Sequence, residues 1–485
     1  MRIVLSVLAI ILLVLALLPL LYSRSLPAGM SLSGADQISQ ARFLGDITWV
    51  DDQGQRHSQQ EIFEQLFQSI ARAQRFILLD MFLYNSFQGP QPENHRELST
   101  ELTEALLNQK KRFPDMDIVV VSDPVNTVYG ALPSPHFEAL RAAGIEVILT
   151  DLDQLPDSNR VYSALWRTLI RPFGVSKGSL LANPFGEGRV SIRAYLKLFN
   201  FKANHRKLLV CDEGKQLVGL VMSANPHDGS SAHGNVAVQF YGKAVDDLLR
   251  SEQGVLDFSG RSDIHLEALV GDLLNTAPAM NANQAASDYS QVKLKVITER
   301  KIKRELLSAI NQATAEDSLD VLVFYLSDEQ IINALIEAKK RDVQLRVLLD
   351  PNKDAFGLEK NGVPNRPVAH LLNQADIPVR WCNTQGEQCH SKMLLTRFSS
   401  GEARLILGSA NFTRRNLDDL NLETDVAIQA SLDSPLILKA AEFFDQAWFV
   451  EPSRIMSLEY EHYADESTLK QWQYRFMEAS GLSTF

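Results

Sequence analysis

The chain has little of what marks several common protein classes. Its 485 residues include only three cysteines, too few for a scaffold held together by disulfides. Lysine and arginine total 48 against 59 acidic residues, giving a net charge of -11. This balance argues against a protein built mainly to hold nucleic acid, which usually shows a basic excess, although a local basic site remains compatible with it.

Most of the histidines also lack the spacing of a metal site. Short patterns such as His-x3-His are absent around His57, His95, His136, His265, His370 and His462. His227 and His233 flank a polar loop and could lie at the rim of a site. We therefore expect no metal and no other cofactor.

One long apolar run stands at the amino terminus. Residues 3–22 are interrupted only by Ser6 and Pro19, and about 20 residues are enough to cross a membrane. A cleaved signal peptide is the alternative, but Leu20–Arg24 lacks a clear small-x-small cleavage site. Residues 1–25 are thus predicted to be a single transmembrane anchor. Both interpretations imply export, and the expected location is the bacterial inner membrane with the body facing the periplasm.

Two short segments, one in each half of the chain, carry the same pair of side chains. His205 and Lys207 lie two residues apart, as do His390 and Lys392. In a strand, residues two apart project to the same face, so each pair can line one surface. Each pair is followed by a Ser-Ala-Asn step, which supplies Ser223 and Asn225 in the first half and Ser409 and Asn411 in the second. The two copies indicate one site assembled from both halves.

These side chains suit phosphodiester cleavage. The charge of a phosphodiester repels nucleophiles and its leaving alkoxide is poor, so catalysis needs a positioned nucleophile, cations at the phosphoryl oxygens and an acid. Two histidines can divide the work, because imidazole titrates near neutrality. Lys207 and Lys392 would supply the charges, and Asn225 and Asn411 can donate hydrogen bonds to the same oxygens.

The motifs end a longer internal repeat of strands and helices. Ile118–Pro124 and Leu345–Pro351 each end a strand in Asp-Pro, and a glycine follows six residues later in both. Strands that alternate with helices predict an α/β fold. We expect two tandem repeats, each a mixed sheet flanked by helices, packed as a pseudo-symmetric pair. The predicted domains are 40–275 and 291–485, joined by a linker at 276–290.

The halves differ most at residues 155–203, an insertion in the first domain. Residues 158–204 hold eight lysines and arginines and one acid, with aromatic residues between them. This mixture suits a membrane–water interface, where rings insert and cations meet anionic lipid. Alternatively, its aromatic residues pack onto their own domain, or the segment grips a nucleic-acid backbone.

The paired motif resembles the signature of the phospholipase D superfamily, H-x-K-x4-D followed by a G-S-x-N-like step. The first copy matches at His205, Lys207 and Asp212, with Met222 in place of the glycine. The second matches at His390, Lys392, Gly408, Ser409 and Asn411, with Arg397 at the acidic position. The tyrosyl-DNA phosphodiesterase branch also lacks this acid, so Arg397 does not by itself indicate a dead site. Asp212 lies on the opposite strand face from its histidine, which favours a structural role.

The resemblance implies the roles of individual residues. One histidine from each repeat faces the other, with His205 as the nucleophile that forms a phosphohistidine and His390 as the general acid. A downstream acid or amide holds each histidine by its far nitrogen. Glu423 is the expected partner on the second side, and Asn235 on the first, with His233 as an alternative.

The favoured function is that of a phospholipase D-like enzyme acting on phospholipid in a membrane. It would give phosphatidic acid with water, or transfer the phosphatidyl group to an alcohol as cardiolipin synthases do, in a site formed within one monomer. The alternatives are a nuclease of the same superfamily and a non-enzymatic lipid-binding protein with a degenerate second motif.

Cys382 and Cys389 lie close to the second motif in sequence. In an oxidising compartment they could form a disulfide that holds His390 in place; alternatively, they are two unpaired thiols.

Overall fold

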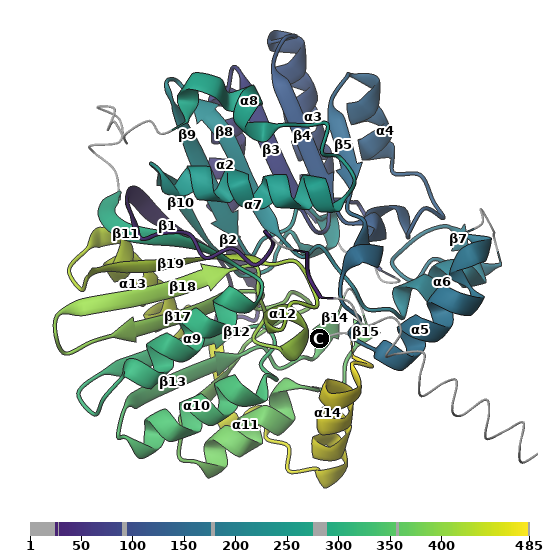
Figure 1. Cartoon of the computed structure of the whole chain (residues 1–485). Coiled ribbons are helices and arrows are strands. Elements are labelled where there is room, and N and C mark those ends of the chain that lie inside the picture. The colour runs from purple at the N-terminus through teal and green to yellow at the C-terminus, as the bar shows by residue number, and fades with distance from the viewer. Residues whose placement is uncertain are drawn as a thin grey trace, which may run out of the picture.

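The computed structural model describes residues 25–27, 29–89, 95–175, 180–274, 289–355 and 358–483. The apolar run at 3–22 lies outside these ranges, as does most of the predicted linker at 276–290. Figure 1 shows the described elements as helices packed against one large sheet.

Sixteen strands of the described chain form one mixed sheet that runs through the molecule (Figure 1). The first half contributes β1 (Gln37–Val50), β2 (Arg56–Gln59), β3 (Phe76–Met81), β4 (Asp117–Ser122), β5 (Glu146–Leu149), β8 (Lys207–Glu213), β9 (Gln216–Met222) and β10 (Asn235–Tyr241). The second half contributes β11 (Ser290–Thr298), β12 (Ser318–Val323), β13 (Gln344–Leu349), β16 (Val379–Cys382), β17 (Lys392–Arg397), β18 (Glu402–Gly408), β19 (Thr424–Ser431) and β20 (Ser457–Glu459). Two short hairpins stand apart, β6 (Leu181–Ala182) with β7 (Arg189–Val190) and β14 (Asp354–Ala355) with β15 (Leu358–Glu359).

The strand order is the same on both sides of the central pair, β1 and β11. Outward from β1 it runs β10, β9, β8, β3, β4, β5, and outward from β11 it runs β19, β18, β17, β12, β13, β16, with β20 at the edge. In each direction the strand that begins with the motif lysine pairs antiparallel with β3 or β12, which pairs parallel with β4 or β13. The predicted α/β class with a mixed sheet is confirmed.

Helices cover the sheet and explain why its inner strands are continuous apolar runs. The helices are α2 (Ile62–Arg72), α3 (Leu98–Arg112), α4 (Pro135–Ala142), α5 (Arg160–Leu169), α6 (Ile192–Leu198), α7 (Ala244–Phe258), α8 (Leu266–Val270), α9 (Arg300–Gln312), α10 (Glu329–Lys340), α11 (Asn365–Gln374), α12 (Arg414–Leu417), α13 (Pro435–Trp448) and α14 (Thr468–Ser480). In β4, Ile118 to Ser122 are all buried, as expected for a strand covered on both faces.

The local signals at the helix ends are those that physical chemistry favours. In α10, the side chain of Asp328 accepts hydrogen bonds from the N–H groups of Gln330 and Ile331, which have no partner within the helix. Lys339 and Lys340 stand in its last turn, where their charge complements the helix dipole.

One hydrophobic core spans both halves of the chain. Buried residues of the first half, such as Phe43 and Val238, belong to the same cluster as Leu322, Leu348 and Leu407 of the second. The two halves are therefore packed as one body, with the motif residues where they meet.

The insertion at 155–203 forms α5, α6 and the β6–β7 hairpin, on one side of the molecule (Figure 1). Its apolar residues divide into two groups. Trp166 and Val190 are buried, whereas Leu169 is 62% exposed and Phe173 is 70% exposed.

The predicted location in the membrane is contradicted. Among the helices within the described ranges, none is long and apolar enough to cross a membrane. The prediction of a single-pass inner-membrane protein with a periplasm-facing body is therefore wrong by this finding. It was based on the apolar run at 3–22, which lies outside the described residues.

Sheet register explains why one Ser-Ala-Asn step follows glycine and the other follows methionine. Gly408 on β18 lies opposite Asp425 on β19, and a Cβ at Gly408 would clash with the Asp425 carboxylate and the Thr424 carbonyl. Met222 on β9 lies opposite Ala237 on β10. In the second half the small residue is Gly408 and the larger one is Asp425 on the partner strand. In the first half the larger residue is Met222 and the small one is Ala237, so the small residue on the partner strand makes room for Met222 in place of glycine.

We predict that Gly408→Ala destabilises the protein by about 1–3 kcal/mol, because the added methyl group overpacks a buried site. Met222→Leu, a swap of similar volume at the equivalent position, is the control and should cost less than about 1.5 kcal/mol. The thermal unfolding midpoints of the two variants provide the measurement. A midpoint for Gly408→Ala at or above that of Met222→Leu would contradict this explanation.

Candidate active site

The chain segments that carry the two histidines are each held by the other half of the chain. The N–H of His205 donates to the carbonyl oxygen of Leu422 at 2.8 Å, and the N–H of His390 donates to that of Gly234 at 2.8 Å. The N–H groups of Leu422 and Gly234 donate in turn, each at 3.0 Å, to carbonyl oxygens two residues before the histidines. These hydrogen bonds complete two short parallel bridges. Both motifs therefore lie where the halves meet.

Each imidazole ring is likewise held by a residue of the other half. Nδ1 of His205 lies 3.0 Å from the Glu423 carboxylate, and Nδ1 of His390 lies 3.1 Å from Oδ1 of Asn235. We predicted the opposite pairing, with Glu423 on the side of His390 and Asn235 on the side of His205, and that prediction is wrong. Each partner directly follows the bridging residue of its own half, so it reaches the histidine of the other half.

The two motif serines orient these partners. Oγ of Ser409 donates to the Glu423 carboxylate, and Oγ of Ser223 donates to Oδ1 of Asn235 at 2.9 Å. Each serine oxygen in turn accepts a 3.0 Å hydrogen bond from the N–H of the residue after the partner. The serines thus position the groups that hold the histidines.

The motif lysines begin β8 and β17 and are fully buried. Nζ of Lys207 donates to the carbonyl oxygen of His205 at 2.7 Å, and Nζ of Lys392 donates to that of His390 at 2.6 Å. The two ammonium groups also lie 4.9 Å and 5.3 Å from the ring centres of two phenylalanines. Each histidine and its lysine therefore form one unit.

Those two rings, Phe82 and Phe324, were missed by sequence reasoning. Phe82 lies 4.7 Å from the ring of His205, and Phe324 lies 5.1 Å from that of His390, measured between centroids. They contact both members of each His-Lys pair and supply a cation–π interaction for the lysines. A signal was present, because each follows the last residue of a corresponding strand, β3 or β12.

The electrostatics of the site link the two motifs. Burial lowers the pKa of His205 well below its usual value, and the charges of Lys207 and Lys392 lower it further. Burial likewise lowers the pKa of His390, with Lys392 and, more weakly, Lys207 and His205 adding to the effect. Burial and these charges thus favour the neutral form of both imidazoles, and each ring lies within reach of charges from the other half.

The buried cations and acids perturb one another as well. Burial lowers the pKa of Lys207 to about 7, while the Glu423 carboxylate opposes this shift. Burial raises the pKa of Glu423 to about 7, with Lys207 opposing it. A site in which ammonium groups are this poorly solvated favours the entry of an anion, which would restore their charge.

The motif asparagines lie in the same buried region. Oδ1 of Asn225 accepts a hydrogen bond from the N–H of Leu83 at 3.2 Å, which leaves its amide N–H groups to act as donors. Oδ1 of Asn411 is buried and has no hydrogen-bond partner among the described residues.

The Asp-Pro landmarks of the repeat also serve the site. The carboxylate of Asp123 accepts a hydrogen bond from the N–H of Asn204 at 2.7 Å, and that of Asp350 accepts one from the N–H of Cys389 at 2.9 Å. Each aspartate thus holds the residue directly before a motif histidine. Their role could not be assigned from the sequence, because the two partners lie far apart along the chain.

A buried ionic network is centred on Arg206, the residue directly after His205. The Arg206 guanidinium donates to the carboxylates of Glu252 at 2.7 Å and Glu299 at 2.6 Å. Glu299 belongs to the second half and also accepts the N–H of Glu423 at 3.3 Å. The arginine between His205 and Lys207 therefore ties both halves together, a role its position in the motif did not reveal.

The acidic position of each motif lies away from the histidines. The Asp212 carboxylate accepts the backbone N–H groups of residues 74–76 at 2.8–3.1 Å and so fixes the start of β3. In the second half, Asp317 at the start of β12 accepts the N–H of Ser399, just past the end of β17, at 2.7 Å. Arg397 instead pairs with Asp320 at 2.6 Å. The acid has moved to the neighbouring strand, and its structural role remains.

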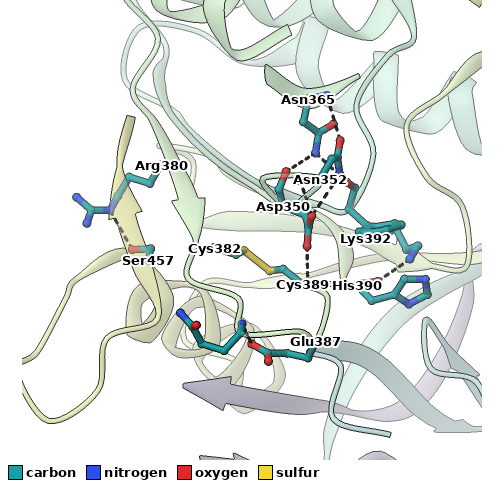
Figure 2. Close-up of a disulfide and its surroundings, with 12 residues drawn as sticks. Asp350, Asn352, Asn365, Arg380, Cys382, Glu387, Cys389, His390, Lys392 and Ser457 are labelled. Atoms are coloured by element: carbon teal, nitrogen blue, oxygen red, sulfur yellow. Dashed lines mark hydrogen bonds between the residues drawn. A yellow bond between two sulfur atoms is a disulfide. The ribbon is translucent and has the colours of Figure 1, made fainter. Parts of the chain in front are cut away.

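Cys382 and Cys389 form a disulfide, with their Cα atoms 6.2 Å apart (Figure 2). Of the two alternatives left open by the sequence, the paired one is present. The bond closes the loop that leads into His390, and Cys389 also donates its N–H to Asp350. Cys211 is a free, buried cysteine.

His233 and His227 form hydrogen bonds with other residues near the motifs. Nδ1 of His233 accepts the N–H of Gln388 at 3.2 Å, and its ring lies 5.8 Å from that of His390, so it packs on the second side. Nδ1 of His227 lies 3.0 Å from Oγ of Ser230. Within the described ranges, no group of three or more histidine, cysteine or acidic side chains could hold a metal ion.

The chain is similar to known proteins in part of its sequence and in its fold. Residues 306–448 match the sequence model of a family described as "Cardiolipin synthase, PLD-like domain". The phosphatidylserine synthase of Haemophilus influenzae Rd KW20 has a similar structure over 95% of this chain and 96% of its own, with 11% identity and a TM-score of 0.54. The phospholipase D family member Nuc of Salmonella typhimurium matches 33% of this chain and 95% of its own, with 21% identity and a TM-score of 0.27. No curated protein sequence matches the chain.

We predict that Arg397→Asp, which restores the acid of the motif, destabilises the protein by about 1–3 kcal/mol. The change removes a cation from the buried Asp320 and adds a like charge beside it. Arg397→Gln, which removes the charge without adding an acid, is the matched control and should cost less. Thermal unfolding compares the two, and an Arg397→Asp variant as stable as the parent would contradict a stabilising contact between Arg397 and Asp320.

Proposed function

We propose that this chain is a phosphodiesterase or phosphatidyltransferase of the phospholipase D superfamily that acts on the head-group phosphodiester of phospholipids. The observation that carries the proposal is the crossed support of His205 and His390, each held at Nδ1 by a residue of the other half. Such support leaves Nε2 of each ring as the reacting nitrogen, and we infer that both rings reach one ligand.

The site is proposed to be shared by two phospholipase D-like repeats, 40–275 and 291–485, within one monomer. Support comes from the identical strand order outward from β1 and β11 and from the two equivalent bridges that exchange the partner residues. A duplicated unit that closes on its copy would produce this arrangement, with one histidine from each copy.

In the first step, Nε2 of the nucleophilic histidine attacks phosphorus and the bond from phosphorus to the head-group oxygen breaks. The departing oxygen takes a proton from the other imidazolium, so the head group leaves as an alcohol. The neutral nucleophile is the form that its low pKa favours. The acid has to gain its proton as the anionic substrate enters, because the pKa of His390 is also low in the free site.

We assign the nucleophile to His205 and the general acid to His390. Attack on phosphorus turns the nucleophilic ring into a cation, which the Glu423 carboxylate beside His205 can stabilise. The neutral amide of Asn235 gives His390 no such charge, so its imidazolium gives up a proton more readily. The difference between the two partners thus supports different roles for the two rings.

In the second step, water or an alcohol attacks the phosphatidyl-histidine. The incoming hydroxyl gives its proton to the now neutral His390, and the phosphorus–nitrogen bond breaks. Water yields phosphatidic acid, and an alcohol yields a new phospholipid. Lys207 and Lys392 would bind the phosphoryl oxygens throughout, with Asn225 and Asn411 donating hydrogen bonds.

A phospholipid surface fits the exposed side chains beside the site. Leu169 and Phe173 of the insertion are 62% and 70% exposed, and Trp472 of α14 is 63% exposed. The end of α14 contacts the start of the insertion, since Arg414 donates both to the Glu478 carbonyl at 3.0 Å and to the Ser158 carbonyl at 3.4 Å. Rings and cations on adjoining elements suit the membrane–water interface.

The test uses the full chain with vesicles of phosphatidylglycerol or phosphatidylethanolamine, with and without glycerol. We expect phosphatidic acid, or a glycerol-exchanged lipid, by mass spectrometry. His205→Ala and His390→Ala should each lower the rate about 100- to 10,000-fold, because each removes a reacting group. His265→Ala, a change of the same kind away from the site, should turn over like the parent.

A donor with a good leaving group separates the two histidines. With phosphatidyl-p-nitrophenol, His390→Ala should release one equivalent of nitrophenolate and retain the phosphatidyl group on His205, because only the second step then needs a proton acceptor. An adduct on His390 in the parent enzyme would reverse the assignment. Alanine variants that turn over as fast as the parent would contradict the two-histidine mechanism. Binding of lipid without turnover by the parent would leave a lipid-binding protein, and cleavage of DNA alone, weakened by salt, would identify a nuclease.

A further inference from the structure

Arg415 is a cation beside the site that none of the steps above uses. It lies in α12, four residues after Asn411. Its guanidinium stacks 5.1 Å above the ring of Phe201, and Nη2 donates to Oγ of Ser483 at 2.9 Å. Nε is buried and has no hydrogen-bond partner among the described residues.

Glu478, the carboxylate whose charge acts on Arg415, is hydrogen-bonded to other groups. Oε1 of Glu478 accepts the N–H of Arg414 and Oγ of Ser327, both at 3.0 Å. Within the described part of the chain, Arg415 forms no ion pair with a carboxylate, and its one side-chain hydrogen bond goes to a neutral hydroxyl. Arg415 is half-buried, and its Nε is shielded from water without an anion to accept its N–H, a cost that a bound anion would offset.

The position of Arg415 connects it to the reacting histidine. Phe201, under the guanidinium, lies four residues before His205, and the carbonyl of Arg415 accepts the N–H of Asn421, two residues before Glu423. A second cation is Lys197, whose Nζ lies 5.9 Å from the ring centre of Tyr129. Burial raises the pKa of Tyr129, and Arg415 opposes that rise. Arg415 thus stands on the His205 side of the site.

We propose that Arg415, assisted by Lys197, binds a second phosphate group of the substrate, separate from the phosphorus that the histidines attack. This rests on the proposed function and names its substrate class as a lipid donor or alcohol acceptor that carries an additional phosphate. A guanidinium presents paired N–H donors to phosphate oxygens, and stacking on Phe201 fixes its plane. The reacting phosphorus itself is served by Lys207 and Lys392, which leaves Arg415 for the second group.

The first test is a binding measurement, which does not need turnover. Calorimetry compares glycerol 1,3-bisphosphate with glycerol 3-phosphate on the full chain. We expect the bisphosphate to bind about tenfold or more tightly, since a charge-assisted hydrogen-bond pair is added, and Arg415→Gln to remove most of that difference. Lys197→Gln should reduce the difference less. Arg250→Gln, which removes one exposed arginine from α7, is the matched control and should keep it.

The second test identifies which substrate carries the phosphate. One arm compares glycerol 3-phosphate with glycerol as acceptor, and the other compares phosphatidylglycerol phosphate with phosphatidylglycerol as donor. In each arm, kcat/KM for the substrate with the additional phosphate is divided by kcat/KM for the substrate without it. Arg415→Gln should lower this ratio about tenfold in the arm whose substrate uses the subsite. The ratio in the other arm should stay near that of the parent.

Two results overturn the proposal. One is equal binding of the two glycerol phosphates by the parent protein. The other is an Arg415→Gln variant that keeps the parent's preference in binding and in both kinetic arms. A protein that passes the binding test but turns over no lipid would contradict the proposed function while leaving the phosphate subsite in place. Should Arg415→Gln fail to fold, Arg415→Lys and Lys197→Gln report on the same preference.

Discussion

The crossed hydrogen bonds between the halves are the constraint on which the rest of the site depends. Glu423 fixes the ring of His205, and Asn235 fixes that of His390, so neither half can orient its own histidine. Main-chain bridges next to both rings set the distance between the halves. The continuous core beneath then has to keep the two halves in one relative position, and the shared cluster of buried residues does so.

The same arrangement places buried charges where the two halves of the chain meet. Lys207 and Lys392 are fully buried, and the acids around them have raised pKa values, that of Asp425 to about 8 because of burial. Arg206 joins Glu252 of one half to Glu299 of the other. Buried pairs of this kind add little net stability, but breaking one leaves an uncompensated charge. These buried charges therefore favour one relative position of the two halves, and they favour the binding of an anion.

The sequence allowed prediction of the residues of the proposed site, but not of the contacts between them. The His-Lys pairs, the Ser-Ala-Asn steps and the Asp-Pro landmarks were all visible as local patterns, and the α/β alternation followed from strand and helix periodicity. The exchange of Glu423 and Asn235 was not visible, because it depends on which segments of distant halves lie side by side. Likewise, the compensations at Met222 and Arg397 lie across strands, at Ala237 and Asp317, where linear spacing gives no signal. The location prediction failed because it used only the apolar run at 3–22.

A crystal structure of the full chain with vanadate tests the central claim most directly, because vanadate adopts the trigonal bipyramid of a phosphoryl group under attack. The account predicts one vanadium atom bonded to Nε2 of His205, with the opposite apical oxygen within hydrogen-bond reach of His390, about 2.6–3.2 Å, and with both motif lysines on the equatorial oxygens. Vanadate bound by one histidine alone, with the other ring turned to a separate region, would contradict it.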